Sequence, residues 1–128
     1  MPSIRAVLAT ALAAATLAQP VAACTRAMFT GADGLVVTGR TMDWEEDIRS
    51  NLWAFPRGIA RNGAAGPDSI AWVAKYGSVI VSGYDVGTAD GMNEQGLVAN
   101  ALYLAESDYG TPAPGTKTLS IALWAQYA

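Results

Sequence analysis

The chemistry that this sequence could perform centres on one thiol. Among its 128 residues there is a single cysteine, Cys24, and there is no histidine. A thiol is a strong nucleophile only as thiolate, and the base that usually removes its proton is an imidazole. No Cys-His pair can form within this chain, so a nucleophilic Cys24 needs another base. The same composition excludes the usual zinc sites, and we expect no metal and no cofactor, although carboxylates alone could still hold calcium or magnesium.

The residues before Cys24 have the features of a secretory signal peptide. Arg5 supplies a positive charge, Ala6 to Leu17 form an apolar stretch too short to span a bilayer, and small residues precede the cysteine. We predict that residues 1–23 are removed and that the protein is exported, to a periplasm or outside the cell. Cleavage after Ala23 would give Cys24 a free α-amine, which titrates near about pH 8 and can act as its base.

Two other interpretations of Cys24 stay open at this stage. Val21-Ala22-Ala23-Cys24 also resembles a lipobox, in which the cysteine is lipidated and its amine acylated. The protein would then be a membrane-tethered binding module lipidated at Cys24. Against this, the strand pattern begins at Thr25 and leaves no flexible polar tether. In the third interpretation, Cys24 is a buried, unreactive thiol of a β-rich structural domain.

The charge and hydropathy patterns exclude two classes of partner. The chain has eight basic and eleven acidic residues and no basic stripe, which argues against nucleic acid. No second long apolar run follows the leader, so we expect no membrane association after signal cleavage.

The residues after Cys24 predict a β-hairpin. Thr25–Thr30 and Leu35–Thr41 are β-prone, and the Asp33-Gly34 pair between them is a strong turn signal. Pairing around this turn places Cys24 opposite roughly Thr41 to Asp43, so Arg40 and Asp43 should lie near the thiol and the α-amine. A carboxylate can orient an amine, and a guanidinium favours thiolate. The alternative is a solvated surface ion pair of little energetic value.

The remaining residues predict a sheet that leads into a helix. We expect about six strands in total, a helix packed on the sheet over Ser120–Ala128, and an apolar face left exposed where that helix is cut off. We predict further strands at Asn51–Phe55, Ile70–Tyr76, Val79–Tyr84 and Leu97–Leu104, loops at Asn62–Asp68 and Gly110–Gly115, and a plain hairpin turn over Asp90–Gly96.

Five short motifs together resemble the choloylglycine hydrolase family, which includes bile salt hydrolases and penicillin V acylases. They are Cys24-Thr25-Arg26, Gly39-Arg40-Thr41-Met42-Asp43-Trp44, Asn51-Leu52-Trp53, Phe55-Pro56-Arg57-Gly58 and Asp90-Gly91-Met92-Asn93-Glu94-Gln95-Gly96-Leu97. The resemblance covers essentially all of residues 24–128. It implies an α+β fold, the αββα sandwich of N-terminal-nucleophile hydrolases, present here only as its N-terminal part. It also implies hydrolysis of a linear, non-peptide C–N amide bond.

The resemblance also assigns roles to individual residues. Cys24 matches the nucleophile, and Arg40 and Asp43 match the catalytic arginine and aspartate. Met42 matches a position that lines the substrate pocket. Tyr103 resembles the oxyanion-site tyrosine of penicillin V acylases, where bile salt hydrolases more often carry asparagine.

The family pattern continues beyond residue 128. Family members carry a further catalytic asparagine and arginine there, so we expect the segment alone to be inactive and the full-length protein to be a homo-oligomer. The substrate would be a small-molecule N-acyl amide: a bile salt conjugate, penicillin V or an N-acyl homoserine lactone. An exported bacterial enzyme suits the last two.

Overall fold

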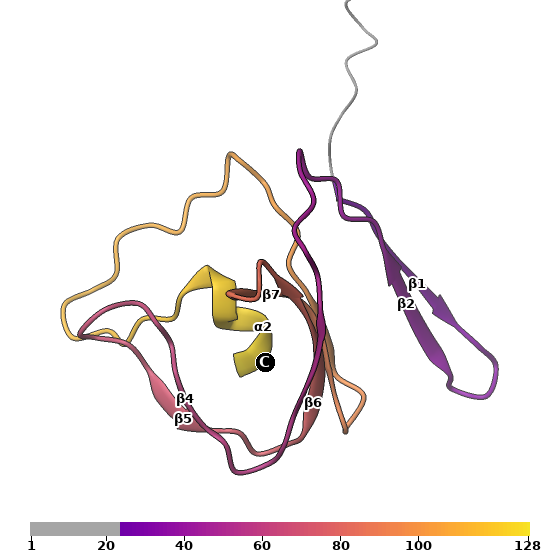
Figure 1. The fold of residues 1–128 in the computed structure, drawn as a ribbon, viewed down its shortest axis with the longest axis horizontal. Coiled ribbons are helices and arrows are strands. Elements are labelled where there is room, and N and C mark those ends of the chain that lie inside the picture. The colour runs from indigo at the N-terminus through magenta and orange to yellow at the C-terminus, as the bar shows by residue number, and fades with distance from the viewer. Residues whose placement is uncertain (1–23) are drawn as a thin grey trace, which may run out of the picture.

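The computed structural model describes residues 24–128 (Figure 1). The predicted signal peptide, residues 1–23, lies outside the described residues. The described part forms eight strands followed by a short helical segment. These elements are β1 (Arg26–Thr30), β2 (Val36–Arg40), β3 (Leu52–Phe55), β4 (Ala60–Asn62), β5 (Ala71–Val73), β6 (Ser78–Gly83), β7 (Gly87–Asn93), β8 (Val98–Asn100), the 3-10 turn η1 (Ile121–Leu123) and α2 (Trp124–Tyr127).

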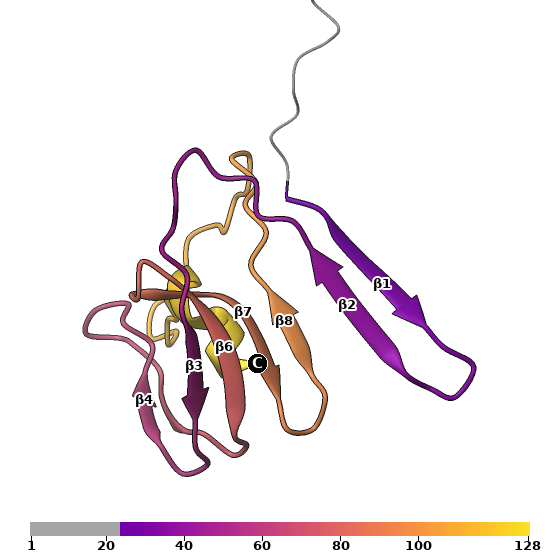
Figure 2. The ribbon, with the colours of Figure 1, turned by 45° about the vertical axis from the view of Figure 1, so that its right-hand side comes forward.

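Strands β1 and β2 form the predicted hairpin. They pair antiparallel, with Arg26 opposite Arg40 at the open end. Gly34 adopts a φ of +81°, which glycine reaches without steric cost, and the Asp33 carboxylate accepts a hydrogen bond from the Leu35 amide at 3.2 Å. The hairpin is a two-stranded sheet of its own, and Figure 2 shows it beyond β8, outside the larger sheet.

The larger sheet has four antiparallel strands in the order β3-β6-β7-β8. Its central hairpin, β6 to β7, turns through Tyr84 and Asp85, which have φ values of 55° and 54°. Two successive residues at positive φ are typical of the turn that matches strand twist. These conformations cost energy in residues with a Cβ atom, so the turn needs support from its surroundings.

The Asp85 carboxylate supplies that support. It accepts hydrogen bonds from Ser82 Oγ at 2.6 Å, Trp53 Nε1 at 3.0 Å and Asn51 Nδ2 at 2.8 Å. These bonds, that from Ser82 above all, lower the pKa of Asp85 below its ordinary value. The charged carboxylate therefore joins the β6–β7 turn to the beginning of β3.

The C-terminal helical segment packs on β7, as the apolar pattern of Ser120–Ala128 predicts. Ser120 caps its start by accepting a hydrogen bond from the Ala122 amide. A Cβ atom on Gly91 of β7 would lie 3.4 Å from the Ala125 carbonyl oxygen and 3.3 Å from Ile80 Cγ2. Glycine thus permits the close approach, and Ile80 and Ala125 are both buried there.

The structure corrects two details of the predicted strand pattern. The plain hairpin turn over Asp90–Gly96 is wrong for its first four residues, because 90–93 belong to β7: all four pair with β6, and 90–92 also pair with β8. The turn itself is confined to Asn93–Leu97, where the Asn93 amide donates to the Leu97 carbonyl oxygen at 3.0 Å. Strand β4, which pairs with β5, was not predicted.

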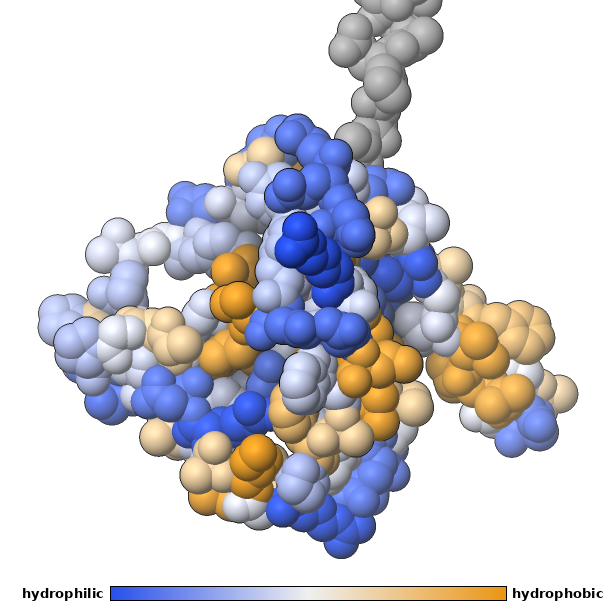
Figure 3. Space-filling model, viewed as in Figure 1, coloured by the Kyte–Doolittle hydropathy of each residue, from blue (hydrophilic) through white to orange (hydrophobic). Residues whose placement is uncertain are grey.

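The β1–β2 hairpin leaves much apolar surface uncovered. Met28, Phe29, Val36 and Val37 are each more than half exposed. Figure 3 shows hydrophobic atoms gathered on the hairpin, apart from the mixed surface of the sheet. This surface lies on the hairpin, whereas the exposed apolar face was expected where the C-terminal helix is cut off, and that expectation stays a prediction. Within residues 24–128, no helix has the length and apolar character needed to cross a membrane.

Candidate active site

Cys24 lies two residues before the start of β1, and the hairpin determines its neighbours. The Thr41 amide donates to the Thr25 carbonyl oxygen at 2.9 Å, which extends the strand pairing one residue beyond Arg26 and Arg40. The same register places Cys24 opposite Met42. The partly exposed thiol donates to the backbone carbonyl oxygen of Asp43 at 3.9 Å. Cys24 therefore lies beside the Thr41–Asp43 segment, as the sequence predicts.

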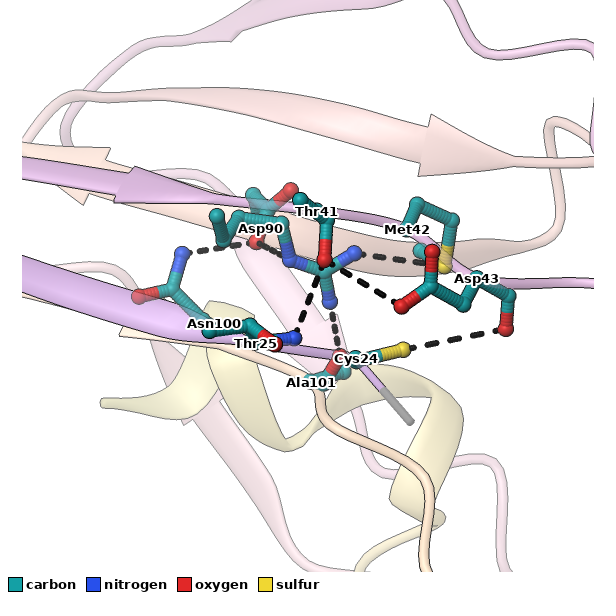
Figure 4. A network of polar contacts seen from close by, with 9 residues as sticks. Cys24, Thr25, Thr41, Met42, Asp43, Asp90, Asn100 and Ala101 are labelled. Atoms are coloured by element: carbon teal, nitrogen blue, oxygen red, sulfur yellow. Dashed lines mark hydrogen bonds and ion pairs between the residues drawn. The ribbon is translucent and has the colours of Figure 1, made fainter. Parts of the chain in front are cut away.

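The Asp43 side chain is oriented by Thr41, which follows the end of β2. Thr41 Oγ1 accepts a hydrogen bond from the Thr25 amide at 3.1 Å and donates to Asp43 Oδ2 at 3.3 Å (Figure 4). In this chain the Cys24 nitrogen is a peptide nitrogen, because residues 1–23 precede it. Removal of those residues would turn it into an amine beside this ordered segment. The role of Thr41 was not predicted from the sequence.

Arg40 is directed inward at the end of β2. Its side chain is only 8% exposed. Nη1 donates to Met42 Sδ at 3.2 Å, and Nη2 donates to the Ala101 carbonyl oxygen. Nε lies 3.2 Å from Asp90 Oδ1 but makes no hydrogen bond, so that contact is an ion pair. The alternative of a solvated surface ion pair therefore does not hold for Arg40, whose guanidinium is largely buried.

Asp90 and Asn100 are two site residues to which the sequence analysis assigned no role. They face each other across β7 and β8, and Asn100 Nδ2 donates to Asp90 Oδ1 at 2.7 Å. The same carboxylate oxygen therefore contacts both the amide and the Arg40 guanidinium. The sequence feature that could have identified Asp90 is its charge at the start of the Asp90–Leu97 motif. Because that motif was assigned to a turn, Asp90 was not considered as a site residue.

Tyr103 lies next to the indole of Trp44, the residue that follows Asp43. The two rings meet edge to face, with centroids 5.4 Å apart and an interplanar angle of 87°. Tyr103 is 65% exposed. No hydrogen bond between Tyr103 and Cys24 is present in the part of the chain that the structure describes. The oxyanion role of Tyr103 stays a prediction.

Trp44 is held in turn by a polar chain. Its Nε1 donates to the Tyr84 hydroxyl at 3.0 Å, and that hydroxyl donates to Glu46 Oε1 at 2.7 Å. Donation to the Glu46 carboxylate raises the pKa of Tyr84 above its ordinary value. The aromatic pair beside Asp43 thus has one oriented member, Trp44, and one largely exposed member, Tyr103.

The hollow between the sheet and the C-terminal helix is separate from this site. It has a volume of about 360 Å³, and its lining includes Trp72, Ile80 and Tyr127 but none of the predicted site residues. Met42 contacts Arg40 and lies across from Cys24, which leaves its predicted place in a substrate pocket a prediction. Among residues 24–128, no group of three potential ligands could hold a metal ion.

Comparison with known proteins gives consistent matches over the described residues. Residues 24–127 match the profile of a family described as linear amide C–N hydrolases, choloylglycine hydrolase family. A penicillin V acylase of Pectobacterium atrosepticum is 46% identical over 131 residues, which cover 94% of this chain and 35% of that protein. The solved structure of penicillin V acylase from Agrobacterium tumefaciens is 56% identical with a TM-score of 0.73, covering 80% of this chain and 32% of that one. The chain thus spans about a third of the length of these relatives.

Proposed function

The chain belongs to the choloylglycine hydrolase family and carries the N-terminal part of the αββα N-terminal-nucleophile fold, and from this premise we propose that it provides the nucleophile of an amide hydrolase. The reaction is hydrolysis of the linear C–N bond of an N-acyl substrate of the penicillin V type. One observation carries the proposal most directly: the thiol of Cys24 lies 3.9 Å from the Asp43 carbonyl oxygen, beside the Thr41–Asp43 segment.

Acylation begins at Cys24 once the residues before it are removed. The α-amine accepts the thiol proton, and the thiolate attacks the acyl carbon to form a C–S bond. The amine proton then passes to the nitrogen of the leaving group, and the C–N bond breaks. Asp43, oriented by Thr41, is suited to hold the α-ammonium between these two transfers.

Deacylation returns the enzyme to its starting state. Water attacks the thioester, the acid product leaves, and the thiol is regenerated. In both steps charge develops on the carbonyl oxygen, and hydrogen-bond donors near Tyr103 would stabilise it, a contribution of about 3 kcal/mol per donor. Arg40 supplies a positive charge on the same side of the hairpin as residue 24.

The aromatic pair of Trp44 and Tyr103 supports an aromatic acyl group as the substrate's recognised part. Edge-to-face rings with exposed surface favour the stacking of a third ring, such as the phenoxy group of penicillin V. The relatives named penicillin V acylase support the same choice. Export by the predicted signal peptide, residues 1–23, would place this activity in the periplasm or outside the cell.

The test begins with the gene product that carries this segment, exported from a bacterial host with its own leader. Intact mass and N-terminal sequencing should show an unmodified Cys24 as residue one. Purified protein should release phenoxyacetate from penicillin V faster than it cleaves a glycine-conjugated bile salt or an N-acyl homoserine lactone.

Two variants separate chemistry from folding in this assay. Cys24→Ser keeps the α-amine and should lose at least about a hundredfold in kcat. Asp68→Asn, a substitution of an exposed carboxylate away from the site, should retain wild-type activity. A lipid on Cys24, or a start at any other residue, would refute the mechanism, and equal hydrolysis by Cys24→Ala would do the same.

A further inference from the structure

Arg40 lies where two separately hydrogen-bonded sheets meet. Strand β2 ends at Arg40 and Cys24 lies just before β1, but the backbone ladder of these two strands does not continue into the four-stranded sheet. The Arg40 guanidinium crosses this gap by contacting the Ala101 carbonyl oxygen, just after β8, and Asp90 on β7. The position of the hairpin relative to β7 and β8 therefore depends on side-chain contacts, and Arg40 makes several of them.

Asp90 is well placed to hold that guanidinium. It is the one carboxylate within ion-pair distance of Arg40 in the described part of the chain, and its own side chain is only 21% exposed. Its Oδ1 also accepts from Asn100 Nδ2 at 2.7 Å, across a register pair of two hydrogen-bonded strands. The Asp90 carboxylate is thus attached to the paired backbone of β7 and accepts a hydrogen bond from the side-chain amide of Asn100.

The guanidinium is in turn directed toward the cysteine end of the hairpin. Residues 40 and 42 lie on the same face of the extended chain, and residue 42 is opposite Cys24 in the register. Arg40 Nη1 donates to Met42 Sδ at 3.2 Å, so the positive group extends along the strand toward Met42. A shift of Arg40 would move positive charge away from the thiol.

We propose that Asp90, braced by Asn100, is a positioning residue that holds the Arg40 guanidinium beside Cys24 and sets the electrostatic environment of the nucleophile. This deepens the proposed function and rests on it, because the brace matters for catalysis only if Cys24 is the nucleophile. A simple structural ion pair would tie the sheets together without affecting the charge that an incoming reagent meets at the thiol.

The decisive measurement compares two alkylating reagents on the gene product after removal of residues 1–23. Iodoacetate is anionic and iodoacetamide is neutral, so the ratio of their rates at Cys24 reports the charge beside the thiol and cancels its general reactivity. A unit positive charge about 5 Å away, acting through water, favours the anion about fourfold. The folded wild type should exceed the ratio of its urea-unfolded form by at least this factor, with the modified peptide identified by mass spectrometry.

The variants give different results for the different roles of Asp90. If Asp90 positions Arg40, Asp90→Asn should lower the ratio about fourfold, to the unfolded value, and Asp90→Glu should restore at least half of the loss. If Asp90 only joins the two sheets, its removal leaves the ratio unchanged, and if it is only a counter-charge, the site becomes more positive and the ratio rises. Either result overturns the proposal. Asp68→Asn, the same chemical change at an exposed site, should leave the ratio unchanged.

A second variant covers the case in which Asp90→Asn does not fold, as judged by circular dichroism. Asn100→Ala keeps the Asp90 charge but removes its brace, and it should lower the ratio about twofold; an unchanged ratio in folded Asn100→Ala overturns the role of Asn100. With penicillin V as substrate, both variants should lower kcat more than they raise KM. Absence of penicillin V hydrolysis by the wild type would count against the proposed function alone, because the alkylation ratio does not depend on turnover.

Discussion

Replacing Thr41 by valine tests how the hairpin orients Asp43. The substitution keeps the shape and the strand preference of the side chain but removes Oγ1. That atom accepts from the Thr25 amide at 3.1 Å and donates to Asp43 Oδ2 at 3.3 Å. Thr41→Val therefore leaves the Asp43 carboxylate free to rotate while the backbone pairing of the hairpin remains.

The geometry of these two bonds determines the expected size of the effect. A hydrogen bond to a charged group contributes about 1.5 to 3 kcal/mol, and the 3.3 Å length and exposure of this one place it at the lower end. A loss of about 1.4 kcal/mol in orientation corresponds to about a tenfold fall in kcat. The free energy of unfolding should fall by only about 1 kcal/mol, because water can replace both partners at this exposed position.

The assay is the pair kcat and KM for penicillin V, with urea unfolding measured in parallel. Thr38→Val is the matched control, since Thr38 lies in β2 and its side chain makes no hydrogen bond within the described residues. Thr38→Val should leave both quantities within about twofold of the wild type. The reasoning is refuted if Thr41→Val retains full kcat, or if Thr38→Val loses as much as Thr41→Val does.

Two further predictions concern the framework. The lowered pKa of Asp85 gives stability that is present above its unfolded pKa of about 3.9 and is lost as pH falls through the lower folded value. Asp85→Asn should therefore lessen the fall in the urea midpoint of unfolding between about pH 4 and pH 2. An unchanged dependence of the midpoint on pH would contradict the reasoning. Gly91→Val would crowd Ile80 and the Ala125 carbonyl oxygen and should lower the free energy of unfolding in urea by about 1 to 3 kcal/mol. In the control Gly39→Val, the added Cβ meets nothing within 4 Å, so the free energy of unfolding should hardly change. Equal losses in the two variants would show that the helix contact is unimportant.

The hairpin next to Cys24 was predictable because every interaction that forms it is local. Asp33-Gly34 determines where the chain turns, and the turn then determines which residues are opposite each other. Counting back from that turn places Cys24 opposite roughly Thr41 to Asp43, and in the structure its thiol donates to the Asp43 carbonyl oxygen; the exact register came from the structure. Family membership was also predictable, since short motifs at characteristic spacing do not require knowledge of the fold.

The environment of Arg40 could not be obtained in this way. Its partner Asp90 is fifty positions away in the sequence, on a strand of another sheet, and no local pattern indicates which carboxylate a guanidinium will meet. The turn-forming character of Asp90, Gly91 and Asn93 was outweighed by pairing with strands on both sides.

The sequence by itself thus determined the family, the hairpin after Cys24 and the residue types that lie beside the thiol. Tertiary structure alone decided that the Asp90 carboxylate contacts both Arg40 and Asn100, and that Trp44 meets Tyr103 edge to face. The physical reason is that hairpin register follows from one turn, whereas contacts between sheets depend on how all the strands pair and pack. The residue type of Arg40 indicates that it can bind a carboxylate, but only the fold places Asp90 within ion-pair distance of it.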